Sequence, residues 1–249
     1  MKRLKVFIVV VLIMLTLNLS MAWAMTAEEI MQQVDEYQHL KSARMKSMMI
    51  ITKGNRTMTK KMVSLIKGAE YGLTKFLNPR DKGSKFLKRS DDLWMFFPDA
   101  EEIIKISGHM LEQGMMGSDF SYQDMMESAK LTDLYHFKVI REEKLNGRLC
   151  YVMEGIKKEG ADAAYYRRIS WIDKERFIPL KEELYARSGR LLKVMKTKEM
   201  KKIDGRWFPT YQIVDNKLKR RTKTEFKVNS IQFNVDIPKN TFSLRNLRR

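Results

Sequence analysis

Apolar and polar positions follow a helical period at the start of the chain and a strand period after it. Ile30, Val34 and Tyr37 fall on one face of a helix. Thr26 has the spacing of a capping box to Glu29, so we expect this helix to begin there and to pack against the rest of the fold. The short apolar runs that follow have a period of two and are bounded by Gly, Asn or Pro. They predict an antiparallel β-meander.

Turn sequences divide the meander into hairpins. Asn146-Gly147 and Asp204-Gly205 stand between strand-like runs, and both pairs are typical of tight hairpin turns. About ten strands with short connections predict a large, mainly β fold in which one antiparallel sheet curls into a barrel or part-barrel. A helix across the mouth of such a sheet would enclose a container for an apolar ligand.

Residues 107–132 interrupt the strand pattern. Within them, the stretch "GMMGSDFSYQDMM" has a Gly-Ser-Asp step between two methionine pairs. We expect Ser121 to cap a short helix with Asp124 in its first turn. Methionine is flexible and polarizable and suits surfaces that repack around a ligand. The pattern leaves open whether these methionines face a cavity or only fill the core.

The first 24 residues predict export. Lys2, Arg3 and Lys5 precede an apolar run, and Ala22-Trp23-Ala24 has the small residues that a signal peptidase reads. A retained anchor is the alternative, but the run is shorter than the roughly 20 apolar residues of a spanning helix. We therefore expect cleavage near Ala24 and a secreted, soluble protein of one domain, residues 25–249.

The charge of this predicted mature chain is strongly positive. The first 24 residues hold three of the 48 basic residues and none of the 30 acidic ones, so 45 minus 30 leaves +15. Such a field favours anionic partners, either lipid headgroups or acidic proteins, and export argues against nucleic acid. The alternative is a solvated outer sheet face on which Lys discourages edge-to-edge aggregation.

Candidate chemistry is sparse. His39, His109 and His136 have no His, Cys or carboxylate at metal-ligand spacing, and no nucleophile elbow or phosphate-binding glycine loop occurs. Asp and Ser beside a glycine, as in residues 117–119, are common turn residues. Cys150 lies in a strand-like run and is expected to be buried. We therefore expect no metal, no cofactor and no enzymatic activity.

Two segments resemble a known family. "SDDLWMFFPDAEEIIKISG" and "MMGSDFSYQDMM" are similar to the Trp-x-aromatic-x-Pro strand and the Gly-Ser-Asp-Phe motif of the outer-membrane lipoprotein-sorting proteins, in their LolA-like branch. The ending "IQFNVDIPKNTFSLRNL" also resembles the family's closing strand and tail. The motif residues here are Trp94, Phe96, Pro98, Gly117, Ser118, Asp119, Phe120, Ser121, Tyr122 and Asp124.

This resemblance implies a half-open antiparallel β-barrel covered by helices, without catalytic residues. It implies a periplasmic carrier that shields the acyl chains of a lipoprotein or lipid and works with an inner- or outer-membrane transport component. A sensor or accessory module on the same scaffold is the alternative. We expect Gly117, Ser118, Asp119, Tyr122 and Asp124 to be structural. The expected lipid contacts are Trp94, Phe96, Met115, Met116, Phe120, Met125 and Met126.

Overall fold

The computed structural model describes residues 25–127 and 130–248, so the predicted signal peptide lies outside the described residues. All strands belong to one antiparallel sheet with the order β6-β5-β4-β3-β2-β1-β13-β12-β11-β10-β9-β8-β7. The strands are β1 (Ser42–Lys53), β2 (Arg56–Lys67), β3 (Tyr71–Phe76), β4 (Lys85–Arg89), β5 (Asp92–Phe97), β6 (Glu102–Ile106), β7 (Tyr135–Leu145), β8 (Arg148–Lys157), β9 (Arg167–Asp173), β10 (Pro179–Tyr185), β11 (Leu191–Ile203), β12 (Arg206–Asn216) and β13 (Thr222–Phe233).

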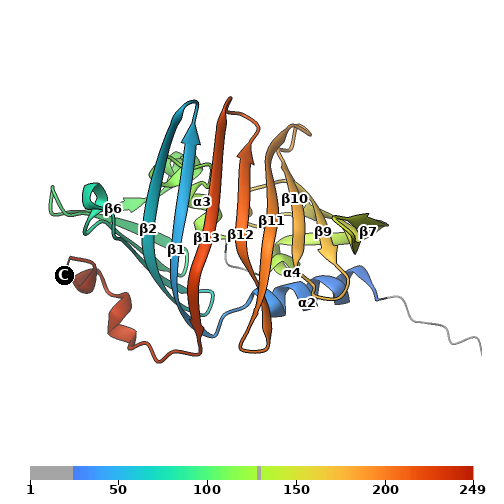
Figure 1. The fold of residues 1–249 in the computed structure, drawn as a ribbon, viewed down its shortest axis with the longest axis horizontal. Helices are drawn as coiled ribbons and strands as arrows, with labels where there is room; N and C mark the ends of the chain where they lie inside the picture. The colour runs from blue at the N-terminus through green and yellow to red at the C-terminus, as the bar shows by residue number, and fades with distance from the viewer. Residues whose placement is uncertain (1–24, 128–129, 249) are drawn as a thin grey trace, which may run out of the picture.

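The predicted fold class is confirmed, and the sheet is not closed because β6 and β7 form its two free edges. The sheet curls around the short helix α3 (Tyr122–Met126) (Figure 1). The part of the chain that the structure describes has thirteen strands, where the pattern predicted about ten. One continuous run accounts for part of this difference, because it turns at Ser90, which has a φ of 49°, and forms both β4 and β5.

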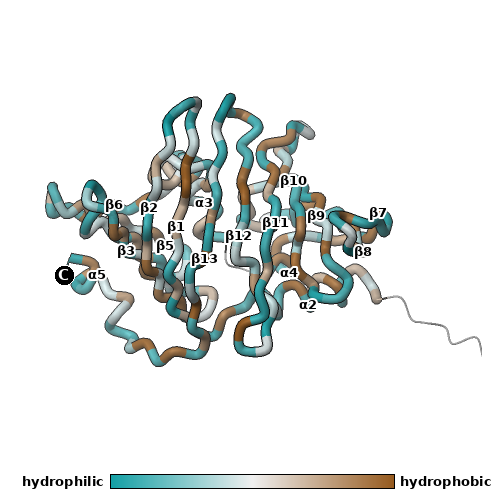
Figure 2. Tube along the Cα trace, in the orientation of Figure 1, coloured by the Kyte–Doolittle hydropathy of each residue, from teal (hydrophilic) through white to brown (hydrophobic). Residues whose placement is uncertain are grey.

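The N-terminal helix α2 (Ala27–Gln38) has the predicted capping box between Thr26 and Glu29. Its buried residues Ile30, Met31 and Val34 pack in one cluster with Leu134 of α4 (Leu131–Leu134) and Tyr135 of β7. Brown segments of the tube in Figure 2 mark the apolar parts of these elements. The helix therefore packs against the sheet, as expected from its amphipathic pattern.

Asp35 joins the two helices. Its carboxylate accepts the backbone N–H groups of Leu131 (2.8 Å) and Thr132 (3.0 Å) and the Thr132 hydroxyl (2.7 Å). These N–H groups begin α4 and have no partner inside that helix. A buried aspartate of α2 therefore acts as the cap of a helix almost 100 residues later in the chain.

The two faces of the strands β3 to β6 bury different clusters. Leu93 and Met95 pack on one face of β5 with Phe76 and Phe86. The other face is covered by the C-terminal segment, which contains the 3-10 helix η4 (Lys239–Phe242) and the helix α5 (Leu244–Arg248). Lys85, which is buried, donates a hydrogen bond to the backbone oxygen of Leu247 (3.0 Å) and ties this segment down.

Candidate functional site

The segment between β6 and α4 forms a compact plug on the inner face of the sheet. It contains the 3-10 helices η2 (Gly108–Glu112) and η3 (Met115–Gly117) and then α3. The N–H of Met115 donates to the Phe120 oxygen (2.7 Å), which closes a tight loop. Within this loop Gly117 has a φ of 82°, a conformation that glycine adopts without strain. We call residues 107–127 the plug.

Methionines from the plug and from the sheet meet in one cluster. Met115 is 8% exposed, and the aromatic ring of Phe120 packs edge-on against Phe226 of β13 at 6.1 Å. Five of the seven expected lipid contacts therefore lie together. The cluster, which we call the methionine cluster, contains Met49, Met62, Met95, Met110, Met115, Met116, Met125 and Met126 together with aromatic side chains.

The two remaining expected contacts lie elsewhere. Trp94 and Phe96 share one face of β5, as the period of two predicted, but it is the face that the C-terminal segment covers. Phe96 is 7% exposed and packs with Phe242 and Leu247. This face is opposite to the methionine cluster, so Trp94 and Phe96 do not join the other five.

The polar residues of the Gly-Ser-Asp motif hold the plug on the sheet. Ser118 is fully buried, and its hydroxyl donates to the Phe120 oxygen (3.2 Å). The N–H of Asp119 donates to the hydroxyl of Thr224 on β13 (2.9 Å), and that hydroxyl donates back to the Asp119 carboxylate (3.1 Å). These contacts give Ser118 and Asp119 structural partners. Neither residue lies beside a histidine in the contacts described.

Asp124 makes a second polar anchor, on the other half of the sheet. Ser121 caps α3 as predicted, and Asp124 completes a capping box with it. The carboxylate also accepts the Lys193 ammonium of β11 (2.5 Å) and the hydroxyl of Tyr165. The Asp124 and Lys193 side chains are 12% and 9% exposed. Burial, and then the Asp124 charge, raise the pKa of Tyr165, so this phenol stays a hydrogen-bond donor.

A buried charged group continues this anchor. Arg168 of β9 donates to Glu127 at the end of the plug (3.0 Å), and its guanidinium lies 4.7 Å from the centre of the Tyr135 ring. Burial raises the pKa of Glu127 against the opposing effect of Arg168, and the nearby carboxylates of Glu182 and Asp124 add to the rise. Charges from the plug and the sheet therefore meet in a desolvated place.

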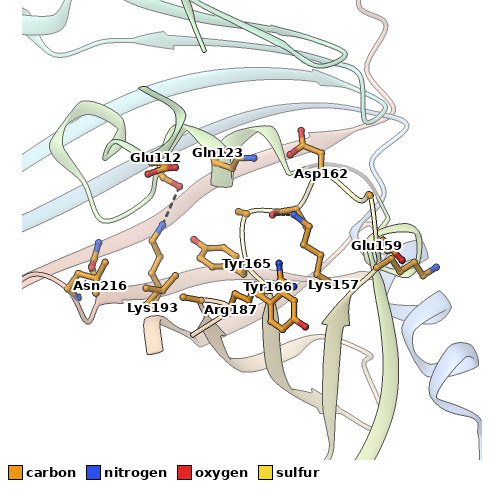
Figure 3. Close-up of a pocket in the computed structure, with 18 residues that line it drawn as sticks. Glu112, Gln123, Lys157, Glu159, Asp162, Tyr165, Tyr166, Arg187, Lys193 and Asn216 are labelled. Carbon is orange, nitrogen blue, oxygen red and sulfur yellow. Dashed lines mark hydrogen bonds between the residues drawn. The ribbon is translucent and has the colours of Figure 1, made fainter. Parts of the chain in front are cut away.

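A pocket of about 1080 Å³ opens beside this anchor. In Figure 3, Glu112 and Gln123 of the plug face Tyr165, Arg187 and Lys193 across it, and the dashed bond joins Lys193 to Ser121. The volume reaches the upper end of the roughly 300–1,000 Å³ range of ligand pockets. The other lining residues are Lys157, Lys158, Glu159, Gly160, Asp162, Ala163, Ala164, Tyr166, Ala186, Leu192, Asn216 and Leu218.

The pocket is therefore amphipathic rather than purely apolar. Four cationic and three acidic side chains line it together with tyrosine rings and a few aliphatic groups. No local pattern pointed to Lys193 or Tyr165, which lie 69 and 41 residues away from Asp124 in the chain. The expected methionine contacts lie in the plug that forms one wall, in the neighbouring cluster.

Two further observations concern chemistry and membranes. Cys150 is fully buried as expected, and burial raises the pKa of its thiol to about 11.

Within residues 25–127 and 130–248, no three His, Cys, Asp or Glu side chains are placed to hold a metal ion. Over the same ranges, each helix is too short or too polar to cross a membrane.

Comparison with known proteins gives the family. A family model described as "Uncharacterized protein" matches residues 68–249, more than half of the chain. Two solved structures cover nearly the same length. A putative outer membrane lipoprotein-sorting protein domain from Vibrio parahaemolyticus is 27% identical, with 90% of this chain and 98% of that chain covered and a TM-score of 0.79. A LolA superfamily protein from Nitrosomonas europaea is 24% identical, with 90% and 100% covered and a TM-score of 0.74.

The chain belongs to the matched family, and its fold is LolA-like. The resemblance inferred from the Gly-Ser-Asp motif is thereby confirmed. A DUF1329 family protein from Desulfovibrio piger has the same fold, at 24% identity over 89% of this chain and 97% of that chain, with a TM-score of 0.82. None of the curated proteins matches the sequence. In this LolA-like protein the plug and α2 cover the inner face of the open sheet.

Proposed function

We propose that this LolA-like protein is a periplasmic, non-catalytic carrier. It binds the acyl chains of a lipoprotein or lipid and moves them between membranes, or to and from a membrane transport component. In this proposal residues 1–24 direct export and residues 25–249 form the single lipid-binding domain. The observation that carries it is the pocket of about 1080 Å³ between the plug and the sheet, beside a cluster of methionines.

The methionine cluster supplies the apolar surface for cargo. Each CH₂ group removed from water contributes about 0.8 kcal/mol. A chain of roughly sixteen carbons would therefore contribute on the order of 10 kcal/mol before its entropic cost. The plug methionines already pack against Met49, Met62 and Met95 of the sheet. An acyl chain that enters from the pocket would exchange these contacts for similar ones, because methionine adapts to many shapes.

The amphipathic pocket suits a ligand with a polar head. Lys157, Lys158 and Arg187 can meet a phosphate or carboxylate, with the acidic lining residues Glu112, Glu159 and Asp162 beside them, and the chain can extend toward the methionine cluster. The polar anchors at Asp119 and Asp124 hold the plug on both halves of the sheet. Movement of the plug would then need these hydrogen bonds to break, which would keep bound cargo from leaving freely.

The test is uptake of acyl chains. The protein, purified after export, should carry lipid that native mass spectrometry detects, and it should bind a fatty acid with a fluorescent label. Replacing Met125 with Gln should weaken this binding about tenfold, because a polar amide would meet the chain. Met58→Gln is the matched control, since Met58 is 41% exposed on β2. Trp94→Leu should leave uptake unchanged, because Trp94 packs on the opposite face.

Two outcomes would reject parts of the proposal. A protein that carries no lipid and takes up no labelled chain is not a carrier. Uptake without transfer between donor and acceptor vesicles would instead favour a lipid sensor on the same scaffold. Mass spectrometry of the exported chain should also show that it begins at Met25. A retained first segment would contradict the proposed signal peptide.

A further inference from the structure

Three hairpin tips lie together at one end of the sheet. They are the turns β1–β2 (residues 53–56), β10–β11 (residues 186–190) and β12–β13 (residues 217–221), all at the top of Figure 1. The Gly54 N–H donates to the Arg221 oxygen (2.8 Å), and the Lys217 N–H donates to the Leu192 oxygen (2.8 Å). These bonds hold neighbouring tips side by side. We call the three turns the basic tip surface.

The charge of the basic tip surface is of one sign. Its three segments contain no Asp or Glu. All of its Lys and Arg residues are exposed, and among the residues that the structure describes only Lys217 has an ion pair, with Asp215. The cations are Lys53, Arg56, Arg187, Arg190, Lys217, Lys219, Arg220 and Arg221.

The opposite end of the sheet differs. There the β11–β12 turn contains Asp204 beside its lysines, and the turn between β2 and β3 contains Glu70. On an ordinary solvated sheet face, lysines would be spread along the strands and acidic side chains would lie between them. The neighbouring β8–β9 turn at the same end of the sheet contains Glu159 and Asp162. The concentration of cations without acids is therefore a property of these three adjacent tips and not of the whole surface.

An apolar side chain stands among these charges. Leu218, within the sequence "KLKRR", is 48% exposed. A leucine at the tip of a basic turn can enter the boundary between headgroups and acyl chains while its neighbours meet anionic headgroups. Leu218 and Arg187 also line the pocket. The basic tip surface is therefore next to the place where cargo would enter.

We propose that the basic tip surface docks on a membrane surface of anionic lipid headgroups, with Leu218 inserted at the acyl boundary. The docked protein presents its pocket to the bilayer, which shortens the path of a chain between membrane and pocket. The docking itself depends only on the charges and on Leu218. Its part in cargo loading rests on the proposed carrier function.

Vesicle sedimentation tests the docking. Residues 25–249 should bind vesicles of phosphatidylcholine and phosphatidylglycerol but not vesicles of phosphatidylcholine alone, and added salt should weaken the binding. Each Lys or Arg at an anionic surface changes the partition coefficient about fivefold. Arg220→Gln with Arg221→Gln should therefore weaken binding about 25-fold. The control, Lys201→Gln with Lys202→Gln, removes the same charge from exposed residues at the opposite end of the sheet. It should change vesicle binding less than about threefold.

A second variant pair tests the leucine. Leu218→Ser should lower the salt-resistant part of the binding, whereas Leu149→Ser, at a position 45% exposed on β8, should not. Equal binding to both vesicle types, or equal weakening by the two charge variants, would overturn the docking proposal. Labelled fatty acid, added without vesicles, separates this failure from failure of the carrier. Uptake that persists without vesicle binding rejects the docking alone.

Discussion

Replacing Asp124 with Asn should weaken the anchor that holds the plug to β11. The variant keeps the shape of the side chain and removes its charge. Lys193 then remains in a place where its side chain is 9% exposed, without the carboxylate that accepts it. Breaking a buried pair by removing one partner costs about 3–5 kcal/mol. We expect about 3 kcal/mol here, because the amide oxygen can still accept one of the hydrogen bonds.

The assay is thermal unfolding, followed by circular dichroism. For a domain of this size, about 1 kcal/mol shifts Tm by about 2–4 °C, so Asp124→Asn should lower Tm by about 6–12 °C. The matched control is Asp215→Asn, because Asp215 pairs with Lys217 and the two side chains are 43% and 40% exposed. Exposed pairs contribute less than about 1 kcal/mol, so the control should lower Tm by less than about 4 °C.

A double-mutant cycle decides whether the effect belongs to the pair. Lys193→Met removes the other charge, and its combination with Asp124→Asn should cost clearly less than the sum of the two single variants. Strict additivity, or a Tm change no larger than that of Asp215→Asn, would refute the reasoning that this contact anchors the plug.

Three further predictions concern single positions. Cys150, with a pKa of about 11, should be at most about 0.1% thiolate at pH 8, so iodoacetamide should alkylate it at least about 100-fold more slowly in the folded protein than in urea. Gly155→Ala should lower the free energy of unfolding in urea by about 1–3 kcal/mol, because the new Cβ would lie 2.5 Å from the Phe137 ring. The control Gly72→Ala should be tolerated, and equal costs of the two variants would contradict the prediction. Burial lowers the pKa of Lys88 to about 8 in the folded protein. Between about pH 8 and 10.4 the unfolded chain therefore binds more protons than the folded protein, and the free energy of unfolding should rise with pH across that window. Lys88→Met should remove this part of the rise in urea titrations, and an unchanged slope would count against it.

Local features of the fold were predictable from the sequence. The capping box at Thr26 and the helix cap at Ser121 formed as expected, since each depends on residues three positions apart. The Asn146-Gly147 hairpin also formed, between β7 and β8. Both glycine-containing turns at Asn146 and Asp204 have the positive φ angles that such hairpins require. At these helix caps and hairpin turns, the neighbouring residues in the sequence determine the structure.

The site was only partly predictable, because it depends on distant partners. β5 is apolar on both faces, so the period of two placed Trp94 and Phe96 together but could not say which face is inside. The C-terminal segment covers the face of β5 that carries Trp94 and Phe96, so the other face of β5 is the inner one. The partners of Asp124, Lys193 and Tyr165, follow no local pattern either. The polar character of the pocket results from these long-range contacts.

The pairing of β1 with β13 at the centre of the sheet has a consequence for the order of folding. The strands β1 to β6 and β7 to β12 can each form by successive hairpins, but the two groups join only through β13. Residues 42–53 must therefore wait for residues 222–233, which lie far later in the chain. Until then the exposed edges of β1 and β12 are open to pairing with other chains, and closing so long a loop is slow. Pairing of β1 with β13, rather than local strand formation, should thus limit when the sheet can first be complete.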